Sequence, residues 1–270
     1  MLRPRRALRL PALHLPAPRL PAGGEAILQG LHLSVAPGVA AGQCAADGLG
    51  PARAVVAAGL ALGGSVLTDV LLGPEPLTPA DHVTRFRSSL VAAQAGRLVA
   101  GGFAGAGHPA RGAPDEDRRT VAQAAVFTLA IGLDAVDGQV ARRTGSSTQR
   151  GWRFDLEADA AAIAVLAATM VHRTGWVLVP GSLRYVFGGV RQVAPALRGG
   201  LQPRLSRRVA AGASMVALVI TTWPQVPGRA VHVLSAGATM ALLASFTRDS
   251  VDLLHAHAAS PPGPATSGRR

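Results

Sequence analysis

Long stretches without charged residues alternate along this chain with short segments rich in arginine. Residues 209–228 carry no charge over 20 positions, and residues 230–247 carry none over 18. A helix of about 20 residues crosses the hydrocarbon of a bilayer, so stretches of this length predict transmembrane helices. We predict six core spans, at 88–106, 120–140, 154–172, 174–190, 209–227 and 230–247.

The chain upstream of these spans predicts additional elements. Residues 53–73 are apolar enough for a seventh span, and 26–42 form a weaker eighth. We expect 26–73 to form an extra N-terminal membrane hairpin and 74–250 to form the main membrane domain. Residues 1–25, rich in arginine and proline, are expected to be a basic disordered tail, and 251–270 a second disordered tail. The predicted fold is therefore an all-α, polytopic membrane helix bundle of six core helices, preceded by a juxtamembrane helix.

The distribution of charge between the predicted spans supports a chain that crosses the membrane several times. The net charge of +12 comes from 27 arginines and no lysine, against 15 acids. Residues 141–153 hold four arginines and no acid, and 191–208 hold five and no acid, whereas 107–119 balance three of each. Cytoplasmic loops carry such an excess of positive residues. We therefore expect a multi-pass protein of a bacterial cell membrane, with the 141–153 loop in the cytoplasm.

Composition narrows the classes that compete with this one. Charged residues make up 16% of the chain, below the roughly 25% of soluble domains. A soluble all-helical protein with alanine-rich core helices is the remaining alternative, and the alternation of loop charge argues against it. Cys44 is the single cysteine, which excludes a disulfide framework. Aromatic residues are only 4%, and no nucleic-acid-binding module is recognisable, so we expect no nucleic-acid partner.

Four aspartates lie within the segment 133–161, at the ends of two predicted membrane helices. Asp134 and Asp137 are about 60° apart around a helix, and Asp155 and Asp159 are four residues apart on one face. The Gly/Ser-rich loop between them lets the two helices pack antiparallel. Ionisable residues at such depth are costly, and their presence indicates a functional site.

Four carboxylates that converge on one point repel one another, so they need nearby cations to offset that repulsion. Oxygen ligands suit Mg²⁺ or Mn²⁺, and two divalent ions about 3.5–4 Å apart commonly serve phosphate ester and anhydride chemistry. On the same helix Gly138 and Ala141 leave room for a ligand close to the backbone, and Arg142 suits a phosphate.

The segment resembles the CDP-alcohol phosphatidyltransferase family. The family signature D-x-x-D-G-x-x-A-R, eight residues, then G-x-x-x-D-x-x-x-D is matched at every fixed position, with residues 143–150 as the spacer. Residues 78–87 resemble the family's juxtamembrane P-N-x-x-T-x-x-R pattern, with Thr84 and Arg87 matching and Ala80-Asp81 replacing Pro-Asn. The resemblance covers about 75–250.

The resemblance implies a reaction and a role for each motif residue. Such enzymes transfer a substituted phosphate from a CDP-linked donor to an alcohol and release CMP. It implies metal ligands at Asp134, Asp137, Asp155 and Asp159, with Asp159 also the general base, and CDP binding by Gly138, Ala141, Arg142 and Gly151.

We expect CDP-diacylglycerol as donor, a small polar alcohol as acceptor, the lipid bilayer as surroundings and a homodimer as the assembly. Inositol phosphate, glycerol phosphate, serine and another phosphatidyl lipid all stay open as acceptors. The alternative function is a non-catalytic membrane carrier that uses the four acids as a cation site.

Overall fold

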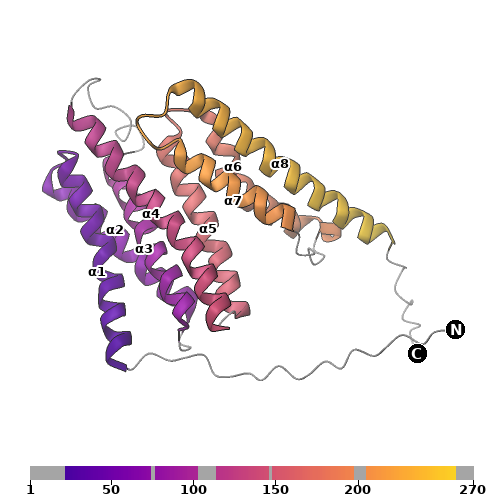
Figure 1. The fold of residues 1–270 in the computed structure, drawn as a ribbon, viewed down its shortest axis with the longest axis horizontal. Helices are drawn as coiled ribbons and strands as arrows, with labels where there is room; N and C mark the ends of the chain where they lie inside the picture. Colours follow the sequence, from indigo (N-terminus) through magenta and orange to yellow (C-terminus); the bar gives the residue numbers. More distant parts are fainter. Residues whose placement is uncertain (1–21, 74–76, 103–113, 146–147, 198–204, 260–270) are drawn as a thin grey trace, which may run out of the picture.

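The computed structural model describes residues 22–73, 77–102, 114–145, 148–197 and 205–259. These residues form helices and no strands (Figure 1). The α-helices are α1 Ala22–Ala46, α2 Pro51–Leu72, α3 Pro79–Gly101, α4 Pro114–Thr144, α5 Gln149–Met170, α6 Leu178–Val193, α7 Leu205–Ile220 and α8 Gly228–Ala259. Two short 3₁₀ helices, η2 Gly175–Val177 and η3 Pro195–Leu197, precede and follow α6. The all-α prediction is confirmed.

Local sequence explains where the helices that carry the site begin. Thr78 and Asp81 form a capping box at the start of α3, and Pro79 occupies the first turn, where its missing N–H costs nothing. Thr148 caps α5 by accepting a hydrogen bond from the backbone N–H of Gly151 at 2.9 Å. Gly145, with φ of 61°, ends α4 in a conformation that suits glycine and turns the chain back toward α5.

Small residues hold the N-terminal part together, and larger ones hold the rest. The interface of α1, α2 and α3 is built from buried alanines and one cysteine: Ala36, Ala40, Cys44, Ala57, Ala61 and Ala93. A second cluster joins α4, α5, η2, α7 and α8 around Phe127, Leu166 and Leu218. In Figure 1, α1 flanks one side of the bundle and α8 the other. Small residues let helix backbones approach closely in a membrane.

The surface of the bundle is apolar in the way a bilayer requires. On α2 the large side chains of Val55, Leu67 and Val70 are more than half exposed. Three helical segments are long and apolar enough to cross a membrane: Pro51–Leu72, Val121–Thr144 and Gly228–Ala258. Val209–Ile220 is apolar but shorter. Helices of this length and hydropathy indicate an integral membrane protein.

The helix ends differ from the predicted span ends by several residues, and three of these differences change the description of the fold. Helix α7 ends at Ile220 and not at 227, because Pro224 and Pro227 follow and cannot continue a helix. Residues 78–87 are the first turns of α3 itself and not a separate juxtamembrane helix. Helix α8 continues through 251–259, which the sequence predicts as part of the disordered tail, and no proline follows Pro227 until Pro261. The remaining tail residues, 1–21 and 260–270, lie outside the described part of the chain.

Candidate functional site

Three helices, not two, build the site. We expect α4 and α5 to pack against each other, and their side chains share a hydrophobic cluster at Phe127 and Leu166. Helix α3 packs against both, with Leu90 and Val91 beside Ala130 of α4 and Ala162 of α5. The motif acids, at the C-terminal end of α4 and the N-terminal end of α5, therefore lie next to α3.

The predicted carboxylates converge. Asp134 and Asp137 of α4 and Asp155 of α5 each offer an oxygen, and these three atoms all lie within 4.8 Å of one another. Asp137 is buried with its side chain 8% exposed, while Asp134 and Asp155 are 40% and 37% exposed. Asp159, one turn further along α5, joins the group through a shared partner on α3. The cluster is thus anchored in protein on one side and accessible on the other.

That shared partner is Arg87 of α3. Its Nη1 donates to Asp134 Oδ1 and to Asp159 Oδ1, both at 2.6 Å, and its Nη2 donates to Asp155. Its Nε lies 3.9 Å from Asp137 Oδ2. The side chain of Arg87 is only 3% exposed. One buried guanidinium therefore touches or approaches every acid of the motif, as its fixed fork of donors allows.

Thr84 fixes the most buried acid. Its hydroxyl donates to Asp137 Oδ2 at 2.9 Å, and both residues are buried. Thr84 lies three residues before Arg87, so the two side chains project from the same face of α3. Helix α3 thus supplies two polar groups that orient the acids.

The replacement of Pro-Asn by Ala80-Asp81 has a visible structural role. Asp81 Oδ2 accepts a hydrogen bond from the backbone N–H of Thr78 at 2.8 Å and lies 3.6 Å from Arg150 Nη2 of α5. A Cβ on Gly151 would lie 2.9 Å from Asp81 Oδ1 and 3.0 Å from Thr148 Oγ1. A side chain at position 151 would therefore require Asp81 or Thr148 to shift, and the predicted contact of Gly151 with CDP stays a prediction.

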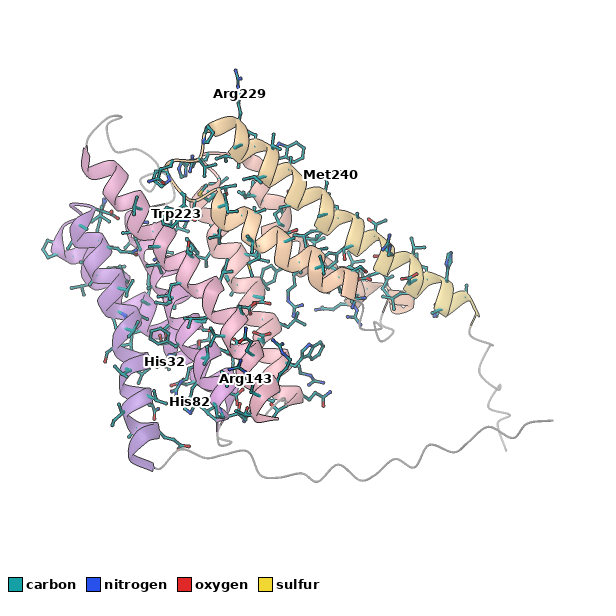
Figure 2. The ribbon with its side chains drawn as sticks, viewed as in Figure 1. His32, His82, Arg143, Trp223, Arg229 and Met240 are labelled. Carbon is teal, nitrogen blue, oxygen red and sulfur yellow. The ribbon has the colours of Figure 1, made fainter. Side chains whose placement is uncertain are left out.

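The other three residues predicted to bind CDP lie together on α4. A Cβ on Gly138 would meet Arg142 Nη1 at 3.3 Å, so the Arg142 side chain lies over this glycine. Arg142 is exposed and Ala141 half-buried. Figure 2 shows the neighbouring Arg143 at the same end of the bundle as His82, opposite to Trp223 and Arg229. Burial, and then the charge of Arg85, lowers the pKa of His82, which is therefore neutral at pH 7.

The donor set fits a hard divalent cation. Three carboxylates with oxygens this close repel one another unless a cation lies between them, and carboxylate oxygens are the ligands that Mg²⁺ and Mn²⁺ prefer. Asp134, Asp137 and Asp155 could hold such an ion.

Sequence reasoning found the four acids but did not assign Thr84 and Arg87 to the site. A signal was present, because both residues match the family's T-x-x-R pattern and are three apart on one helical face. Their contacts with acids 47 to 72 residues away depend on how α3 packs.

The model of a protein family described as CDP-alcohol phosphatidyltransferase matches residues 80–247. The match begins one residue into α3 and includes every residue of the acid cluster, Thr84 and Arg87. Comparison with curated proteins and with solved structures finds no significant match. The helices α1 and α2 lie outside the matched residues.

Proposed function

The chain belongs to the CDP-alcohol phosphatidyltransferase family, and we propose that it transfers a phosphatidyl group from CDP-diacylglycerol to a small polar alcohol. The observation that carries this proposal is the convergence of Asp134, Asp137 and Asp155 at the end of membrane helices. A donor with acyl chains reaches such a site from the bilayer, and a polar acceptor reaches it from water.

We infer that the four motif acids, Asp134, Asp137, Asp155 and Asp159, hold two divalent cations, Mg²⁺ or Mn²⁺. When bound, these ions would neutralise the pyrophosphate of the donor and stabilise CMP as it leaves. Arg142 would pair with a phosphate, and Gly138 and Ala141 would let the CDP portion approach the helix backbone. Gly151 would keep the start of α5 close enough to complete this surface.

Asp159 is our choice for the general base. Its side chain is 32% exposed, so an alcohol can reach it, and it lies one turn beyond Asp155. In the proposed step Asp159 takes the hydroxyl proton as the alcohol oxygen bonds to the phosphorus that carries the diacylglycerol. The bond from that phosphorus to the CMP oxygen breaks, and CMP leaves with that oxygen.

We place the site on the cytoplasmic side of the membrane. Arg142, Arg143, Arg150 and Arg153 surround the turn between α4 and α5, and positive residues concentrate in cytoplasmic loops. A CDP-linked donor and a phosphorylated or polar alcohol are both intracellular metabolites by chemical class, which agrees with this placement.

The test is CMP release by the purified full-length protein in detergent or lipid nanodiscs. CDP-diacylglycerol is supplied with each of a panel of polar alcohols, with Mg²⁺, with Mn²⁺, and after stripping with a chelator. We expect CMP release that depends on one alcohol and on added metal. Metal binding without CMP release for any alcohol would favour the carrier alternative, and undiminished turnover in the stripped protein would refute the two-metal mechanism.

A further inference from the structure

Helix α3 carries two buried arginines that face opposite directions. Arg85 is 5% exposed and Arg87 2% exposed. Residues two apart on a helix are separated by about 200° around its axis. Arg87 points to the acid cluster of α4 and α5, and Arg85 points to the hairpin formed by α1 and α2. Helix α3, which completes the site, is therefore held by ion pairs on two opposite sides.

The tie to the hairpin is a bidentate ion pair. Arg85 Nε and Nη2 donate to the two oxygens of Asp69 on α2, both at 2.6 Å. His32 of α1 lies 3.2 Å from Asp69 Oδ1 through its Nε2, and its Nδ1 contacts the hydroxyl of Ser89 on α3. Figure 2 shows His32 on the purple helix α1, above His82. Three helices thus share one buried polar network.

Further contacts join the C-terminal half of α3 to the end of α1 and to α2. Gln94 donates to Gln43 at 2.8 Å, and Arg97 donates to Asp47 at 2.6 Å, both partners being on or just after α1. A Cβ on Gly96 would lie 2.4 Å from the backbone oxygen of Ala57, so α2 and α3 touch backbone to backbone there. Such close packing fixes both the rotation of α3 and its position along its axis.

A chain of contacts runs from Ser89 to His32 and from His32 to Asp69. This is the order of nucleophile, base and acid in a hydrolase active site. Ser89 is 0% exposed and His32 is 2% exposed, so no substrate reaches the serine hydroxyl. Asp69 is also fully engaged by Arg85. This arrangement serves structure and not covalent catalysis.

We propose that the hairpin α1–α2, which lies outside the residues matched by the family model, is a positioning element for the site. By holding Arg85, it sets α3 in the register that brings Arg87 and Thr84 to the acids of α4 and α5. Asp69 is the positioning residue, because it supplies the charge to which Arg85 is tied. The proposal rests on the proposed function, since it concerns the same site.

The test compares Asp69→Asn with Asp249→Asn in the full-length protein. Asp249 is buried and pairs with Arg207 at 2.7 Å across α7 and α8, so its loss removes a similar ion pair far from α3. Three quantities are measured for each protein: the melting temperature, the Mn²⁺ concentration that half-saturates the metal-induced rise in that temperature, and kcat and KM for the CDP-linked donor.

We expect both variants to melt at a lower temperature. Asp69→Asn alone should also need less Mn²⁺, because a displaced Arg87 competes less for the acids, and should lose kcat by roughly ten- to a hundredfold with a smaller change in KM, because displacement of a catalytic group by about 1 Å has an effect of that size. Asp69→Glu, which restores the charge, should recover part of the loss. Ser89→Ala, a milder change to the same network, should shift the metal response in the same direction and serves if Asp69→Asn does not fold.

A different pattern would overturn the proposal. If Asp69→Asn and Ser89→Ala lowered the melting temperature but kept the wild-type Mn²⁺ response and kcat, the hairpin would be a stabilising addition only. The metal response is measured without turnover. Absence of CMP release from the wild-type protein would therefore count against the proposed function, while the comparison of variants would still decide the role of the hairpin.

Discussion

Replacement of Arg87 by glutamine should make the metal-free protein less stable and at the same time make it bind divalent cations more tightly. Arg87 is the buried cation that three motif carboxylates contact directly. Glutamine keeps much of the side-chain volume and some donor capacity but removes the charge. The substitution should lower the stability of the metal-free protein and raise its affinity for the cation. Simple misfolding would lower both, so the two measurements together distinguish it from this prediction.

The expected loss of stability depends on how exposed the carboxylate partners of Arg87 are. Leaving one side of a buried ion pair without its partner typically costs about 3–5 kcal/mol. Asp134, Asp155 and Asp159 are 40%, 37% and 32% exposed, so water screens part of their repulsion. We therefore expect a loss of about 2–3 kcal/mol. A cation present at a hundred times its dissociation constant contributes about 2.7 kcal/mol, which would offset that loss.

The tighter metal binding has an electrostatic cause. Arg87 places a positive charge beside the same oxygens that would ligate a cation, and two unit charges about 4 Å apart interact by about 4 kcal/mol at an effective dielectric constant of 20. Water at the exposed side of the cluster screens part of this interaction. We expect at least about 1.4 kcal/mol of it to affect cation binding, which lowers the dissociation constant about tenfold.

The assay is thermal unfolding of the chelator-stripped protein during titration with Mn²⁺, with isothermal titration calorimetry for the dissociation constant. Arg207→Gln is the control, because it breaks the pair with Asp249 and leaves the acid cluster untouched. We expect the control to lose stability with an unchanged Mn²⁺ response. Weaker Mn²⁺ binding by Arg87→Gln than by the wild type would refute the reasoning and would make Arg87 a support for the metal ligands and not a competing cation.

Three further predictions concern the base, the buried acid and the topology. Asp159→Asn should lower kcat by about 10²–10⁴-fold at saturating metal while binding of the CDP-linked donor survives, and near-normal turnover would show that another group is the base. Thr84→Val removes the hydrogen bond to Asp137 and should cost about 1 kcal/mol of stability in chemical denaturation, whereas no loss would mean that water replaces the hydroxyl. Gln149→Cys, in a Cys44→Ala background, should resist an impermeant thiol reagent in intact cells and react in inverted vesicles; ready labelling from outside would reverse the topology.

The parts of the site that could be predicted are those that depend on local geometry. The four acids lie within 26 residues on two helices, so helical periodicity alone places each pair on one face. The contact of Arg87 with Asp134, Asp155 and Asp159 depends on α3 packing against both α4 and α5, through a cluster that includes Ala130 and Ala162. Alanine in an apolar helix is compatible with a lipid-facing side or a buried one, so the sequence pattern did not show which helices touch.

The same limit applied to Asp69, whose partner the sequence did not reveal. Its counter-charge, Arg85, lies 16 residues away on the next helix, so no local spacing pairs the two residues. A shift of α3 by one residue would rotate both of its arginines by about 100° and move them about 1.5 Å. Arg85 would then leave Asp69, and Arg87 would leave the acid cluster, so two buried charges would lose their partners together. Because Arg85 and Arg87 are buried in protein, that joint cost favours a single register of α3 and keeps the site assembled.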